Sequence, residues 1–172
     1  MSDFDERPLA DEVRREIEML AGAARELLDL PPSGADPRTI VGSIDAALRT
    51  QGWLERTGLE PDEAAIALGA LWGEQLARAF GWQWVTLTET EPDDDEAEDE
   101  DDEHVGVVPS DRRYLVFPTY FIRGLLEPEA EVTALLTFNM IASGNLPPAE
   151  TGEYIELGAP EVDEDDDEEE EE

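Results

Sequence analysis

The chain has 172 residues, 46 of them acidic and 11 basic, with a formal net charge of −35. This charge opposes direct binding to nucleic-acid phosphate or anionic lipid, because both require attraction to basic side chains. Cysteine is absent, which excludes disulfides, thiolate metal sites and cysteine nucleophiles and fits a reducing compartment. With no signal-peptide pattern and no apolar stretch near ~20 residues, we expect a cytoplasmic protein that does not span a membrane.

Three amphipathic helices are predicted in the first half of the chain, over residues 9–30, 37–51 and 61–80. Each shows apolar side chains at spacings of three and four residues, with prolines or glycines at its ends. Asp36 is the expected N-cap of the second helix and Pro37 its first residue. In the third, Gly69 and Gly73 lie one turn apart, so either another element approaches closely on that side or the glycines are simply tolerated there. Trp72 falls on the buried stripe.

Beyond Gly81 the apolar period changes from 3.6 to 2, which predicts strands. Residues 82–90, 104–108 and 113–117 are expected to form a three-stranded antiparallel meander. Both faces of the first strand are apolar near its start, so we expect other parts of the protein to pack against both sides of it. The acid-rich segment 91–103 then becomes a hairpin loop at one end of the sheet. Arg112 and Arg113 lie at the other end, about 15–20 Å away at ~3.4 Å per residue.

Two further helices are predicted over residues 119–127 and 129–143, and residues 154–157 carry the last side chains able to anchor the chain. The expected fold class is α+β, with N-terminal helices, the small meander and C-terminal helices. We expect one domain over residues 1–158, and a tail over 159–172.

Acidic residues are concentrated in two runs. Residues 91–103 hold 11 acids in 13 positions, and residues 161–172 hold 11 in 12. Such density of like charge with little apolar surface predicts a disordered loop and a disordered tail. The loop lacks the glycine that a calcium-binding turn needs, so we expect no cofactor and only weak, non-stoichiometric divalent binding. Its candidate ligands are Asp93, Asp94, Asp95, Asp99, Asp101 and Asp102.

The segment Leu68–Leu126 carries a set of Gly, Trp and Pro motifs. They are Gly-x-x-x-Gly-Glu-x-Leu (69–76), Gly-Trp-x-Trp-Val (81–85), Pro-Ser-Asp-Arg-Arg-Tyr (109–114) and Val-Phe-Pro (116–118). This third of the chain resembles an uncharacterised bacterial domain family of unknown function. The resemblance implies an α+β fold and no assigned activity.

The sequence offers no catalytic motif. His104 is the only histidine and follows directly after the first acidic run, where a strand-end role beside a loop is the interpretation we favour. No Ser–His–Asp spacing, phosphate loop, dinucleotide-binding glycine turn or zinc helix occurs. We therefore predict no catalytic residue.

Several residues are candidates for contact with a partner. Acids of the loop could attract a basic protein, the arginine pair lies on a turn, and three aromatic residues would be the first to examine if an apolar patch is exposed. For the tryptophans, a core or edge position is the favoured interpretation, since an indole buries a large area. The candidates are Glu96, Glu98, Glu100, Glu103, Arg112, Arg113, Trp53, Trp84 and Tyr120.

Three functions remain open from sequence. The first is a non-enzymatic bacterial interaction protein that binds a basic protein, as immunity proteins and effector chaperones do, with the acidic segments steering association. The second is a nucleic-acid mimic or histone-chaperone-like buffer of basic proteins. The third, ranked last, is an enzyme acting on a small cationic substrate with a carboxylate such as Glu74. In each case the acidic runs have a simpler explanation, which is solubility. The oligomeric state is left open.

Overall fold

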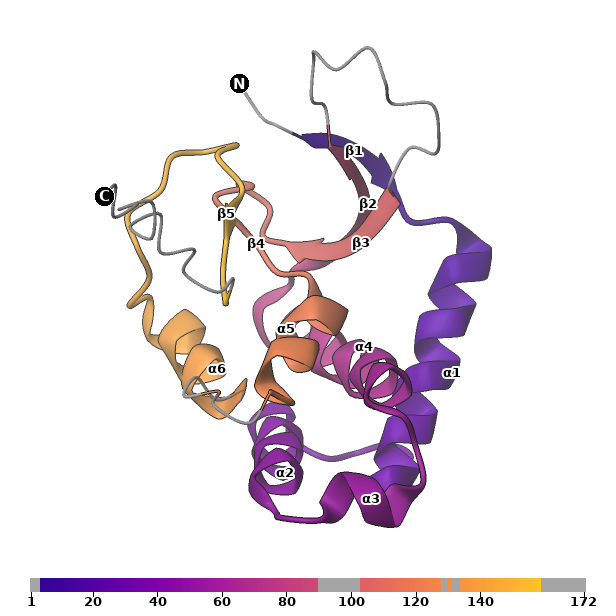
Figure 1. Ribbon diagram of the computed structural model, residues 1–172. Coiled ribbons are helices and arrows are strands. Elements are labelled where there is room, and N and C mark those ends of the chain that lie inside the picture. Colours follow the sequence, from indigo (N-terminus) through magenta and orange to yellow (C-terminus); the bar gives the residue numbers. More distant parts are fainter. Residues whose placement is uncertain (1–3, 90–102, 128–129, 131–133, 159–172) are drawn as a thin grey trace, which may run out of the picture.

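The computed structural model describes residues 4–89, 103–127, 130 and 134–158 (Figure 1). Within them the fold is mixed α+β, as predicted, with a three-stranded antiparallel sheet and helices before and after it. In chain order the elements are β1 (Phe4–Pro8), α1 (Asp11–Leu27), α2 (Pro37–Arg49), α3 (Trp53–Thr57), α4 (Pro61–Phe80), β2 (Gln83–Glu89), β3 (Glu103–Val108), β4 (Tyr114–Leu115), α5 (Pro118–Leu125), α6 (Ala134–Ser143) and β5 (Ile155–Glu156). No helix in these ranges is both long and apolar enough to cross a membrane.

The three predicted N-terminal helices are confirmed, and their ends follow from local chemistry. The Asp36 carboxylate accepts a hydrogen bond from the Thr39 amide at 3.3 Å, and Pro37 opens α2. A capping box of Glu60 and Glu63 begins α4. Gly81, with φ 70°, ends α4 in the left-handed region that glycine adopts readily. The sequence prediction missed α3, a helix of 5 residues.

The sheet has the order β1-β2-β3, so the predicted membership of the meander is wrong. Its third strand is the N-terminal segment Phe4–Pro8, which pairs with β2 in the register Glu6↔Leu87. Residues 113–117 give only the two-residue β4, which pairs in parallel with β5, and a single antiparallel bridge from Val116 to Val107. Segment 4–8 has three charges and a proline in five residues, and the periodicity of so short a strand is not detectable.

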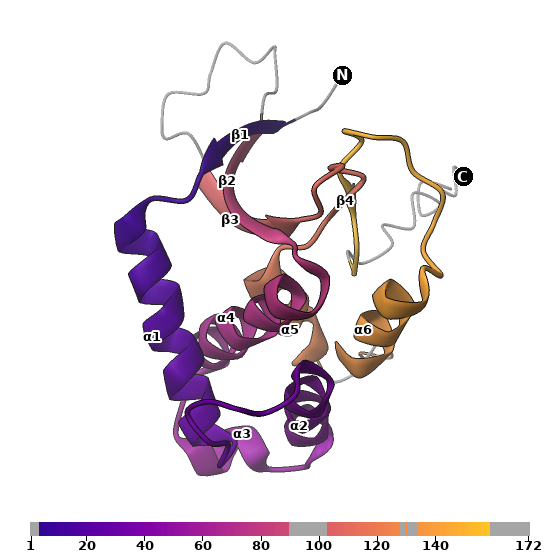
Figure 2. The same ribbon diagram turned by 180° about the vertical axis from the view of Figure 1, so that it is seen from behind.

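Helix α4 is the centre of the helical layer, since it packs against α1, α2, α5 and α6 and also contacts β2 and β3 (Figures 1 and 2). Trp72 on this helix is fully buried and tilts against Phe121 with ring centroids 4.9 Å apart, so its predicted core position is confirmed. At the two glycines the structure shows the first alternative, close approach of another element. A Cβ on Gly69 would lie 2.9 Å from backbone atoms of Pro118 and Thr119, and one on Gly73 would overlap the Trp84 ring.

Apolar side chains cover both faces of the sheet, as expected for β2. Val107 and Trp82 belong to the main core around α4. Val85 and Leu87 belong to a second, smaller cluster on the opposite face with Phe117. Phe4 and Tyr154 pack on the edge of that second cluster, which therefore joins both ends of the described chain.

The C-terminal helices follow the prediction in part: α5 and α6 are present, but Ala130, which the sequence predicts to lie in the last helix, is not helical. Pro118 opens α5, and α6 ends at Gly144, whose φ is 73°. Leu157 is buried and anchors the segment after β5. The predicted start of the last helix at residue 129, most of the acidic loop (91–102) and the acidic tail lie outside the described residues.

Candidate functional site

The acidic run is attached at one end of the sheet. Strand β2 ends at Glu89 and β3 begins at Glu103, and Thr88 pairs with Glu103 in the antiparallel register. The attachment points therefore lie where the sequence predicted them. Glu103 is exposed, and its carboxylate lies 3.5 Å from Arg7 Nη1 of β1. Both side chains are more than half exposed, so this ion pair contributes little to stability.

Tyr120 lies at the same end of the sheet through its contact with His104. Its hydroxyl is 3.5 Å from His104 Nδ1, and the two rings meet edge to face with centroids 5.8 Å apart. His104 also meets the edge of the buried Phe117 ring. Tyr120 is 59% exposed. Its role as a partner contact stays a prediction. The structure thus places Glu103 and Tyr120, two predicted partner residues, at the same end of the sheet, where Tyr120 contacts the imidazole of His104.

Arg112 follows the opposite end of β3 and is held within the fold. Its Nε donates to Glu6 Oε1 at 2.8 Å and its Nη2 to Glu6 Oε2 at 3.0 Å. The Tyr154 hydroxyl donates to Glu6 Oε1 at 3.0 Å, and Arg112 Nη2 also donates to Gln83. We call these three residues, Glu6, Arg112 and Tyr154, the Glu6 clasp. They join β1, the turn after β3 and the segment before β5.

The clasp shifts the pKa values of its members. The hydrogen bonds from Arg112 lower the pKa of Glu6, and the same bonds raise the pKa of Arg112. Burial raises the pKa of Tyr154, with the Glu6 hydrogen bond adding to it. At neutral pH the clasp is therefore a carboxylate held by a guanidinium and a neutral phenol. The Arg112 side chain is committed to it, whereas Arg113 is half exposed beside Asp111 at 3.3 Å.

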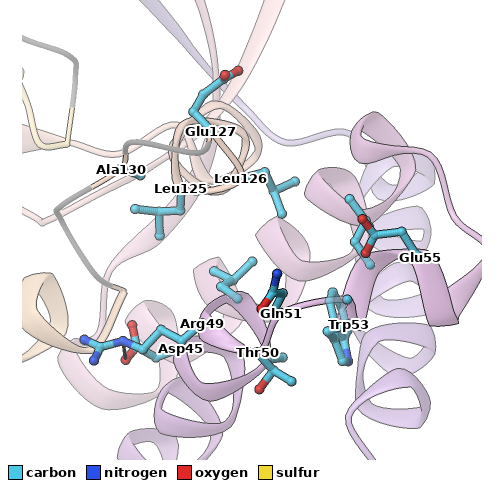
Figure 3. A pocket seen from close by; sticks show the side chains of 14 residues that line it. Asp45, Arg49, Thr50, Gln51, Trp53, Glu55, Leu125, Leu126, Glu127 and Ala130 are labelled. Carbon is cyan, nitrogen blue, oxygen red and sulfur yellow. Dashed lines mark ion pairs between the residues drawn. The ribbon is translucent and has the colours of Figure 1, made fainter.

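The two candidate tryptophans are half-buried in different surroundings. Trp84 lies against Gly73 of α4. Trp53 lines a cleft of about 590 Å³ between the end of α2, α3 and the end of α5. Figure 3 shows Leu125 and Leu126 facing Gln51 and Trp53 across this cleft, with the Asp45–Arg49 ion pair at 2.9 Å on its wall. The structure does not bring Trp53, Trp84 and Tyr120 into one patch.

A second concavity lies between α1 and α4, and sequence reasoning missed it. This α1–α4 groove has a volume of about 640 Å³. It is lined by six apolar residues and three glutamates: Leu20, Ala23, Leu27, Leu59, Ile66, Ala67, Glu16, Glu26 and Glu63. A signal was present in the sequence, because Met19 and Ile66 are large apolar residues that fall outside the predicted buried stripes of their helices.

Glu74, the carboxylate considered for acid–base chemistry, is engaged with neighbouring side chains. Its Oε2 lies 3.5 Å from Nη2 of Arg25 and accepts a hydrogen bond from Gln75 Nε2 at 3.1 Å. Arg25 and Gln75 are both buried, so this carboxylate balances a buried guanidinium. Within the described ranges, no group of three or more His, Asp or Glu side chains is placed to hold a metal ion.

Comparison with known proteins gives no relative from which to transfer a role. No protein-family model matches the chain, and no curated protein or solved structure matches it significantly. The resemblance of residues 68–126 to a bacterial domain family stays a prediction.

Proposed function

We propose that this protein is a non-enzymatic interaction protein of the bacterial cytoplasm that binds a basic protein, in the manner of an immunity protein or an effector chaperone. The main support for the proposal is the uneven distribution of charge along the chain. The runs 91–103 and 161–172 hold 22 of the 46 acidic residues and no base, and all 11 arginines lie in the rest of the chain. A folded body is thus joined to two dense polyanions.

Internal ion pairing supports the same interpretation. Six arginines lie within 4.0 Å of a carboxylate of the protein itself: Arg7, Arg25, Arg49, Arg112, Arg113 and Arg123. Much of the positive charge is therefore neutralised locally, and the long-range field is negative. Such a field raises the association rate with basic proteins, while the folded surface supplies specificity.

The two acidic runs allow a matched test, because each holds 11 acids. Replacing every Asp by Asn and every Glu by Gln over 91–103, or over 161–172, changes the net charge equally. The first step is a pulldown at low salt to recover a basic partner, followed by stopped-flow or biosensor kinetics on each variant. We expect both variants to slow association more than they speed dissociation. We expect the larger loss of affinity for 91–103, which is attached to the sheet at both ends.

Two outcomes would refute the proposal. One is a pulldown that recovers no basic protein at low salt. The other is an association rate that neither variant changes and that does not fall between low salt and about 0.15 M salt, where the Debye length shortens to ~8 Å. If many unrelated DNA-binding proteins were bound in proportion to their charge, and DNA competed for them, the protein would instead be a nucleic-acid mimic.

A further inference from the structure

The α1–α4 groove has an apolar floor built by helical spacing. Leu20, Ala23 and Leu27 of α1 are three and four residues apart, so they lie along one face of that helix. Ile66 and Ala67 of α4 form the facing wall. The volume of about 640 Å³ is in the range of protein binding pockets. Helix α1 forms the outer edge of the helical layer (Figures 1 and 2).

One exposed apolar side chain, Ile66, lines this groove, and another, Met19, lies on α1 next to two of its lining residues. Met19 is 70% exposed and Ile66 is 41% exposed, and they are two of the four large apolar residues that stand out as exposed in the described ranges. Met19 lies three residues from Glu16 and four from Ala23, which makes it a neighbour of both on the helix surface. Apolar surface that is left uncovered beside a concavity is typical of an interaction site.

The charged residues that line the groove are all acidic. Its charged lining residues are Glu16, Glu26 and Glu63, and none of its lining residues is basic. Glu63 is fixed at the start of α4, because its carboxylate also accepts the Glu60 amide at 3.1 Å. An apolar floor with carboxylates at its rim is complementary to a helix that has an apolar face flanked by Lys or Arg.

The same charges argue against the other occupants. The acidic runs 91–103 and 161–172 of this chain would place carboxylates against carboxylates. A second copy would bring together two chains of net charge −35. We propose that the α1–α4 groove binds a basic amphipathic helix of a partner protein. The proposal rests on the function proposed above, and it names the surface and the form of the partner.

The test uses the full chain and two synthetic peptides of leucine and lysine, each of about 18 residues or five helical turns. One peptide has its leucines at i, i+3, i+4 and i+7, and the other has the same composition in an order that gives no apolar face. Fluorescence anisotropy at about 0.15 M salt should show that the amphipathic peptide binds at least ~10-fold more tightly than the peptide without an apolar face. In a spectrum of ¹³C-methyl methionine, the resonance of Met19 should shift on binding, and that of half-buried Met140 on α6 should not.

Two pairs of variants locate the site. Ile66→Asn should weaken binding of the amphipathic peptide about fivefold, because the part of Ile66 still exposed can no longer be buried against an apolar face. The matched control is Leu136→Asn, at an exposed leucine on α6. Glu16→Gln should weaken binding about two- to threefold, and Glu18→Gln, on the same helix but outside the lining, should leave it unchanged. Circular dichroism checks that each variant is folded.

The outcomes separate this inference from the proposed function. If both peptides bind equally and the groove variants behave like their controls, attraction to basic partners stands and the groove is not the site. If neither peptide binds at low salt and no basic protein is recovered, both proposals fail. If the Met140 resonance shifted as much as the Met19 resonance, the proposal that the peptide binds in the groove would also be refuted.

Discussion

Gly69→Ala is expected to destabilise the protein, although alanine is the better helix former. In an exposed helix interior the same change stabilises by roughly 1 kcal/mol. At Gly69 the added methyl would lie 2.9 Å from the carbonyl carbon and oxygen of Pro118 and from Cα of Thr119. Ordinary carbon contacts are about 3.5–4.0 Å, so α5 has to move by more than half an ångström or the helices must separate. The obstacle is backbone and has no alternative rotamer.

The chain supplies a matched control in Gly22, an exposed position within α1. A Cβ there meets no atom within 4 Å. Both variants gain the same helix propensity, so the difference between them isolates the packing cost, which we expect to be about 1–3 kcal/mol for an overpacked contact. Urea unfolding followed by circular dichroism gives the free energies, with equal m-values showing that the unfolded reference is unchanged. Thermal midpoints should differ by several degrees.

The reasoning would be refuted if Gly69→Ala raised stability as much as Gly22→Ala does. That result would mean that α5 can move away from the added methyl group without loss of stability. The contact between α4 and α5 would then not be a rigid feature of the core.

The remaining predictions concern buried or half-buried charges. Glu6→Gln should cost about 1–2 kcal/mol at pH 7, since two charge-assisted bonds to Arg112 are weakened. The pKa of Glu6 is lowered from its ordinary 4.5, so the clasp contributes fully above pH 4.5 and its contribution is lost as the pH falls through the lower folded value. The difference between the thermal midpoints of the two proteins should therefore shrink as the pH falls below 4.5. A difference that stays constant would refute the contribution of the clasp to stability. Glu74→Gln should cost up to about 3 kcal/mol by removing the charge partner of buried Arg25, against roughly zero for the exposed Glu18→Gln, in urea unfolding.

The sequence predicted the helices and most strand positions because the residues that begin, end or face the core of an element are recognisable from their own chemistry. Asp36-Pro37 marks a helix start in any context, and Gly81 marks an end. Trp72 on an apolar stripe has few alternatives to a core position. The two glycines of α4 also left room for a close contact, although the sequence did not say with which element. Pro118 and Trp84 turned out to fill those spaces.

Strand pairing and surface concavities depend on which segments meet, and periodicity does not encode this. The segment Phe4–Pro8 gains its strand conformation from β2, far along the chain. The α1–α4 groove is likewise a property of two helices together. Ile66 stands outside the buried stripe of its own helix, but only the packing of the two helices shows that it lies beside an uncovered space.

The Glu6 clasp also has a consequence for the order in which the protein can fold. Glu6 and Tyr154 are 148 residues apart, so the clasp joins one residue to another that is synthesised much later. A nascent chain can pair β1 with β2 and β3 once residue 108 has left the ribosome. Arg112 can bond the Glu6 carboxylate only after four more residues have emerged, and the Tyr154 hydroxyl can join it only when residue 154 follows. Strand β1 is at the edge of the sheet, so the bond from Tyr154 adds a restraint that its pairing with β2 alone does not supply. Slower amide exchange in β1 would report that the clasp has closed.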